Sequence, residues 1–113
     1  MSNQAPEHIE IAKEMRKVSD RLDAASKEIF RMAKEKAEKE MIYRKRLAQE
    51  IMIVRESGLP ATLVGDVARG NIADLKFERD LSTDLFKAGI ESLGAVKVQA
   101  SVLQSIHKRY DNL

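Results

Sequence analysis

The sequence contains no cysteine and no tryptophan, and it has only two proline, three phenylalanine and two tyrosine residues among 113. Without cysteine the chain has no disulfide, no thiol nucleophile and no thiolate ligand for a metal. It also lacks any run approaching the ~18–20 apolar residues of a membrane-spanning helix. Residues 1–6 are polar and show no apolar signal segment. We therefore expect a soluble, cytoplasmic protein with no contact to membranes.

The residues that break regular structure are gathered in one place. Residues 7–57 contain neither proline nor glycine, whereas residues 58–70 hold three of the five glycines and one of the two prolines. Proline is absent again from residues 71–110. Because glycine and proline punctuate periodic segments, this distribution predicts a single domain spanning residues 1–113. We expect a flexible tail at 1–6, a long helix at 7–57, a turn with a short helix at 58–70 and a long helix at 71–110.

Apolar residues recur at alternating spacings of three and four in both long segments, which is the heptad pattern of helices that pack side by side. In the first segment they are Met15, Val18, Leu22, Ala25, Ile29 and Met32. In the last segment they are Ile72, Leu75, Phe86, Gly89, Leu93, Val96, Ala100, Leu103 and Tyr110. Arg79 and Ser82 interrupt this apolar face, and Phe77, Leu81 and Leu85 widen it beside them. The pattern predicts an all-α, coiled-coil-like antiparallel hairpin with a short connecting helix.

Local signals predict where these helices end. Gly58 should close the first long helix and Gly70 the short one, each in the left-handed conformation that glycine tolerates. Asn71 should then cap the last helix. From the lengths at ~1.5 Å per residue, the last helix would reach back only to about the level of Lys17. The first turns of the opening helix would then overhang.

Two helices enclose little apolar volume, so the predicted core is completed by a second copy or a partner. We expect a homo-oligomer, a dimer or larger. Gly89 and Gly94 each cost a helix ~1 kcal/mol relative to alanine, and the close approach of another helix would explain them. The predicted oligomer or packing interface comprises Leu22, Ile29, Leu47, Ile51, Phe86, Gly89, Leu93, Val96 and Leu103.

The net charge of +2 is small, but residues 31–46, the basic stretch, hold seven basic and three acidic residues. Clustered Lys and Arg neutralise phosphates, and an aromatic side chain can stack on a base. The possible nucleic-acid contacts are Arg31, Lys34, Tyr43, Arg44, Lys45 and Arg46. Asp80 and Asp84 should lie opposite this stretch in the hairpin and neutralise part of it, which weakens the nucleic-acid interpretation.

Few patterns point to chemistry. The sequence has no glycine-rich phosphate loop, no compact Ser-His-Asp set and no histidine pair at i,i+4. His107 and Asp111 form an i,i+4 pair, but two ligands do not make a metal site. We predict no catalytic residue, no metal and no cofactor, and hence a protein that is not an enzyme.

Four segments carry a resemblance to a known group of proteins: residues 43–47, 58–63, 66–70 and 75–80. Over roughly residues 40–110 the chain resembles small uncharacterised helical proteins encoded by phages and prophages of Gram-positive bacteria. The resemblance implies an accessory phage protein made in the host cytoplasm, and it transfers no functional residues. The leading hypothesis is a non-enzymatic interaction protein that binds a host or phage protein. The alternative is a nucleic-acid-associated factor that uses the basic stretch.

Overall fold

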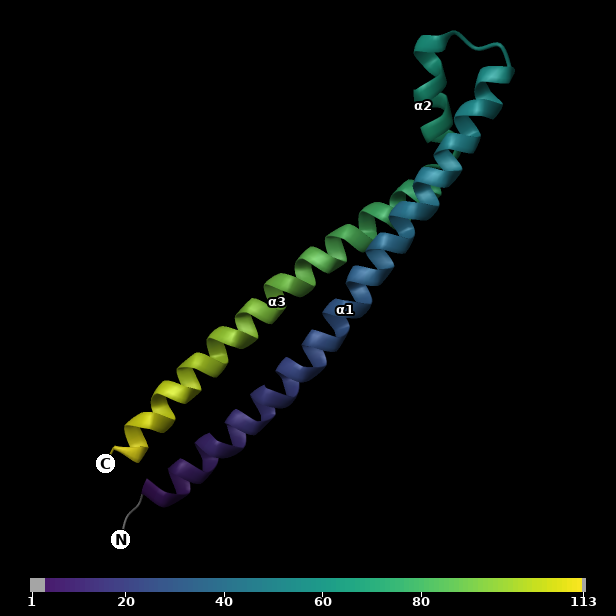
Figure 1. The fold of residues 1–113 in the computed structure, drawn as a ribbon. Coiled ribbons are helices and arrows are strands. Elements are labelled where there is room, and N and C mark those ends of the chain that lie inside the picture. Colours follow the sequence, from purple (N-terminus) through teal and green to yellow (C-terminus); the bar gives the residue numbers. More distant parts are fainter. Residues whose placement is uncertain (1–3, 113) are drawn as a thin grey trace. The chain divides into compact units, whose positions relative to one another are not determined.

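The computed structural model describes residues 4–112, with side chains from residue 7 onward. These residues form three helices and no strand: α1 (Gln4–Glu56), α2 (Ala61–Asn71) and α3 (Ala73–Asp111). The all-α hairpin with a short connecting helix is thereby confirmed (Figure 1). None of the described helices combines the length and the apolar character needed to cross a membrane.

The chain divides into two compact units. Unit 1 combines α1 as far as Phe30 with α3 from Ala88 onward, and unit 2 is Arg31–Lys87. Unit 2 therefore contains the second half of α1, the whole of α2 and the beginning of α3.

The end of α1 agrees with the prediction, whereas its start does not. The helix already includes Gln4, so its start is earlier than the predicted residue 7, and the rest of the predicted tail, residues 1–3, lies outside the described residues. At the other end Gly58 has a φ of +85°, as predicted for the residue that stops the helix. The Ser57 hydroxyl donates a 2.5 Å hydrogen bond to the Val54 carbonyl, which satisfies a backbone acceptor of the last turn.

The break between α2 and α3 differs from the prediction. Gly70 is helical, without a positive φ, and Asn71 is the last residue of α2, so neither of their predicted capping roles is correct. The break instead falls at Ile72, which has φ −120° and ψ 31° and is buried. The Asn71 amide donates to the Glu50 carboxylate at 3.0 Å instead of capping α3. Burying Ile72 and pairing Asn71 with α1 thus outweigh the local stop signal.

The core of unit 2 lies where α2 folds back against the end of α1 (Figure 1). Val54 of α1 packs with Val64 and Ala68 of α2, and all three are buried. The partly buried residues packed around them are Leu47, Ile51 and Val67. Because α2 packs beside the last turns of α1, α3 begins to pair with α1 closer to the N-terminus of α1 than the sequence predicts.

Unit 1 has a thinner core. Its one buried apolar residue among those described is Val18, and the other heptad positions of α1 in this unit are half-buried. The start of α1 contacts the end of α3, because the Tyr110 hydroxyl of α3 donates to the Glu7 carboxylate of α1 at 2.6 Å. The predicted overhang of the first turns is therefore wrong. The prediction assumed that α3 starts beside the last turn of α1, whereas α2 fills that place.

Candidate interaction surfaces

An apolar stripe on α3 borders a groove in unit 2. Phe77, Leu81 and Leu85 follow one another at four-residue spacing, which places them on one side of a helix, and they are 65%, 44% and 49% exposed. Beside them lies a groove of about 140 Å³ lined by Glu35, Lys39, Glu78, Leu81, Ser82 and Leu85. The polar groups of the lining are engaged: Lys39 pairs with Glu78 at 3.3 Å, and the Ser82 hydroxyl donates to the Arg79 carbonyl at 2.8 Å.

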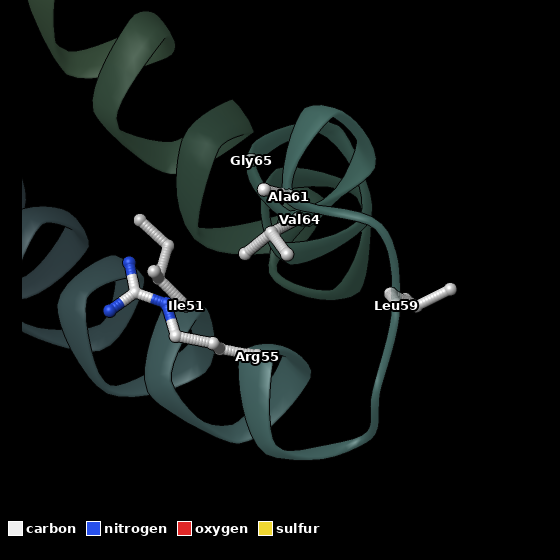
Figure 2. Close-up of a pocket in the computed structure, with 6 residues that line it drawn as sticks. All are labelled: Ile51, Arg55, Leu59, Ala61, Val64 and Gly65. Atoms are coloured by element: carbon white, nitrogen blue, oxygen red, sulfur yellow. The ribbon is translucent and has the colours of Figure 1, made fainter.

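A second concavity, the end pocket, lies between the last turns of α1 and the first turns of α2. It measures about 310 Å³ and is lined by Ile51, Arg55, Leu59, Ala61, Val64 and Gly65. Figure 2 shows Ile51 and Arg55 on α1 facing Ala61 and Val64 on α2, with Leu59 on the connecting segment. Arg55 forms no ion pair within the described residues, so a cationic group stands beside an otherwise apolar lining.

Arg79 and Tyr43 anchor a polar network in unit 2. The Arg79 guanidinium lies over the Tyr43 ring, 4.2 Å from its centroid, and it is 3.0 Å from Asp80 and 3.6 Å from Glu40. Hydrogen bonds from Lys76 and then from Arg79 lower the pKa of the Asp80 carboxyl below its ordinary value. The cation over a ring and the paired carboxylates indicate a structural contact that fixes α3 against α1.

The structure alters the basis of the nucleic-acid hypothesis. Tyr43 is only 4% exposed, and Arg79 covers its ring, so that the ring offers no face for a base. Most cations of the basic stretch are paired four residues along α1 itself, and Asp80 is engaged within α3 instead of opposite them. The pairs are Arg31–Glu35 at 2.9 Å, Lys34–Glu38 at 3.9 Å, Arg44–Glu40 at 2.6 Å and Arg46–Glu50 at 3.1 Å. Lys45 forms no ion pair within the described part of the chain.

The residues predicted for an interface are all half-buried in the single chain. Leu47 and Ile51 already pack on the core of unit 2, and the Lys36 ammonium lies 5.3 Å from the centroid of the Phe86 ring. The others occupy the less exposed face of α1 or α3 in unit 1: Leu22, Ile29, Gly89, Leu93, Val96 and Leu103. Their role between copies stays a prediction. A Cβ added to Gly94 would meet no atom within 4 Å, so no helix of the same chain approaches it closely.

A cluster of possible metal ligands lies in unit 1, where α1 begins and α3 ends. His8 Nε2 is 2.9 Å from His107 Nε2 and 3.3 Å from an Asp111 oxygen, and His107 Nδ1 is 3.2 Å from the other Asp111 oxygen. The i,i+4 pair of His107 and Asp111 is visible in the sequence. The third member, His8, was missed because the predicted register left the first turns of α1 without a neighbour.

Comparison with protein-family models, with curated proteins and with solved structures finds no match to this chain.

Proposed function

We propose that this chain is a non-enzymatic interaction protein that acts as a homodimer of helical hairpins and binds a second protein. The observation that carries the proposal is the distribution of apolar side chains in unit 2. Five apolar residues of this unit are buried, whereas nine of its large apolar side chains are exposed. Exposed apolar surface of this extent on a small helical protein favours association.

The stripe of Phe77, Leu81 and Leu85 supports a second copy as the occupant of the groove. A two-fold axis through this surface would set stripe against stripe, since an isologous interface uses the same patch on both copies. Four antiparallel helices would then enclose the core that two helices lack. Lys39 and Glu78 of the groove lining pair with each other at 3.3 Å, so a second copy would cover charges that are already neutralised.

Light scattering at micromolar concentration tests the dimer. We expect a mass of at least twice 12.8 kDa. The double variant Leu81→Glu with Leu85→Glu should be monomeric and still helical, because both side chains are about half exposed in the single chain. Met52→Glu, at a 62% exposed residue of α1 outside the groove, is the matched control and should remain dimeric. A cooperatively folded wild-type monomer would contradict the proposal.

The end pocket supports binding of a partner protein. Its apolar lining and the unpaired Arg55 suit a segment with an apolar side chain next to a carboxylate, because the guanidinium can form a charge-assisted hydrogen bond. The charged groups of the groove are engaged in ion pairs, Lys39 with Glu78 at 3.3 Å and Glu35 with Arg31 at 2.9 Å, which favours binding over catalysis.

Capture from infected or lysogenic cells, with protein and nucleic acid both identified, would supply the partner. The purified partner should then bind two variants more weakly. Arg55→Glu reverses the charge of the end pocket, and Ala61→Phe fills the pocket. Arg109→Glu, at an exposed residue near the end of α3, is the control and should bind normally. Equal affinity of all variants would show that the end pocket is not the docking site.

The phage origin and the cytoplasmic location belong to the same proposal and are supported by the sequence resemblance. Nucleic-acid binding stays the alternative function. It is disfavoured by the burial of Tyr43 and by the ion pairs along α1.

A further inference from the structure

Three side chains with metal-binding groups converge in unit 1 from opposite ends of the chain. The ligand atoms of His8, His107 and Asp111 all lie within 4.8 Å of one another. His8 and His107 are 99 positions apart in the sequence, so antiparallel pairing of α1 with α3 brings them together. The two imidazoles are half-buried and Asp111 is exposed, which leaves the cluster accessible to an ion from solution.

The chemistry of the donors selects a class of ion. Two imidazole nitrogens and one carboxylate oxygen suit divalent transition metals of intermediate softness, such as Zn²⁺. Ca²⁺ and Mg²⁺ prefer sites composed of oxygen atoms and are poorly matched to a set with two nitrogens. Three protein ligands also leave one position of a tetrahedral ion for water.

Two of the three distances between these ligand atoms are close to those that such an ion requires. Bonds of ~2.0–2.1 Å from a tetrahedral Zn²⁺ place neighbouring ligand atoms about 3.3 Å apart. His8 Nε2 and Asp111 Oδ1 are separated by 3.3 Å. The two Nε2 atoms are 2.9 Å apart, so they need to separate by only about 0.4 Å to reach the tetrahedral spacing. We propose that His8 Nε2, His107 Nε2 and Asp111 Oδ1 bind a single Zn²⁺-like ion.

Neighbouring contacts prepare the ligands for binding. Asp111 lies 3.3 Å from His8 Nε2 through one oxygen and 3.2 Å from His107 Nδ1 through the other, so the carboxylate is already beside both imidazoles. His8 stacks beside Tyr110, with the ring centroids 6.1 Å apart and the planes 19° from parallel. Tyr110 in turn donates to Glu7, so α1 and α3 are joined next to the cluster by a contact that needs no metal.

The bound ion would fasten the first turns of α1 to the last turn of α3. Both segments are helix ends, where the hydrogen-bond ladder is incomplete and fraying is easiest. An ion that binds only the folded arrangement raises stability in proportion to its concentration relative to the dissociation constant. The inference concerns unit 1 alone and does not depend on the proposed dimer or partner.

Isothermal titration of the full chain with ZnCl₂, without any histidine tag and in a weakly coordinating buffer, tests the site. We expect one ion per chain with micromolar or tighter affinity. Losing a partner of a metal ligand typically weakens binding ~10–100-fold, so His8→Ala and His107→Ala should each weaken it by at least ~100-fold. Asp84→Asn removes an exposed carboxylate in unit 2 and is the matched control with unchanged affinity.

Two further measurements separate this site from adventitious binding. Amide hydrogen exchange should slow at both helix ends when Zn²⁺ is added, and His8→Ala should abolish that protection while circular dichroism shows the helices intact. Co²⁺ should give the intense visible absorption of a tetrahedral complex, which His107→Ala should lose. Unchanged Zn²⁺ affinity in either histidine variant would overturn the inference. A zinc-dependent doubling of the mass would also overturn it, because the ligands would then come from two copies.

Discussion

Replacing glycine by alanine is expected to change the free energy of unfolding in opposite directions at Gly58, which precedes α2, and at Gly70, which lies near its end. Gly58 has a φ of +85°, and a Cβ there would meet no atom within 4 Å, so the penalty comes from the backbone alone. A left-handed conformation costs a residue with a Cβ ~1–2 kcal/mol. Alanine also lowers the conformational entropy of the unfolded chain, which stabilises the folded state by ~0.4–1 kcal/mol. We therefore expect Gly58→Ala to lower the free energy of unfolding by about 1 kcal/mol.

Gly70 presents the opposite case. It is helical, its φ is not positive, and a Cβ there would also meet nothing within 4 Å. In a helix interior, alanine is favoured over glycine by ~0.8–1 kcal/mol. Gly70 is the next-to-last residue of α2, so we expect about half of that gain.

Thermal melts followed by circular dichroism at one fixed protein concentration measure both effects. For a chain of this size, 1 kcal/mol corresponds to a Tm change of about 4 °C. Gly58→Ala should therefore melt about 4 °C below the wild type and Gly70→Ala about 2 °C above it. Fixed concentration matters because association shifts the Tm. A destabilised Gly70→Ala variant would refute the assignment of the break to Ile72, and an unchanged Gly58→Ala variant would refute the helix end at Gly58.

Three other outcomes are expected. Gly94→Ala should stabilise the chain by up to ~0.8–1 kcal/mol in the same melts, because its Cβ meets open space; a lower Tm would indicate that another copy packs there. The lowered pKa of Asp80 contributes stability that is present above its ordinary value of 3.8 and is lost as the pH falls through the lowered pKa. Asp80→Asn should thus lose less stability than the wild type in melts between about pH 5 and 2. By fluorescence anisotropy, the basic stretch should bind DNA or RNA more weakly than ~10 µM at ~0.15 M salt; sub-micromolar binding would favour the nucleic-acid alternative.

The sequence predicts the helices well because their signals are local. The run without proline or glycine and the heptad spacing define α1 and α3, and Gly58 ends α1 as expected. The signals at Gly70 and Asn71 misled because a tertiary effect, the burial of Ile72 and the Asn71–Glu50 hydrogen bond, determines that break.

The candidate sites were harder to predict because they depend on register. Placing α3 too far toward the end of α1 left His8 without a neighbour, and the His8–His107 contact was therefore missed. The same reasoning assigned the neutralisation of the basic stretch to Asp80 and Asp84. Lys39 pairs instead with Glu78 of α3, and glutamates one turn away on α1, such as Glu40 and Glu50, form other pairs. Such i,i+4 pairs require no tertiary information and were open to prediction from spacing.

The uneven spread of buried side chains has a consequence for how the chain opens. Among the described residues, five of the six buried apolar side chains belong to unit 2, and Val18 is the one in unit 1. Opening free energies follow the density of such contacts, so native-state exchange should rank amides around Ala68 as slowest and those of unit 1 as fastest. A protease added to the folded protein should accordingly nick the stretch before Phe30 or after Ala88 first. Further cleavage would then proceed from the termini toward α2, and the segment around α2 would be the last protected fragment.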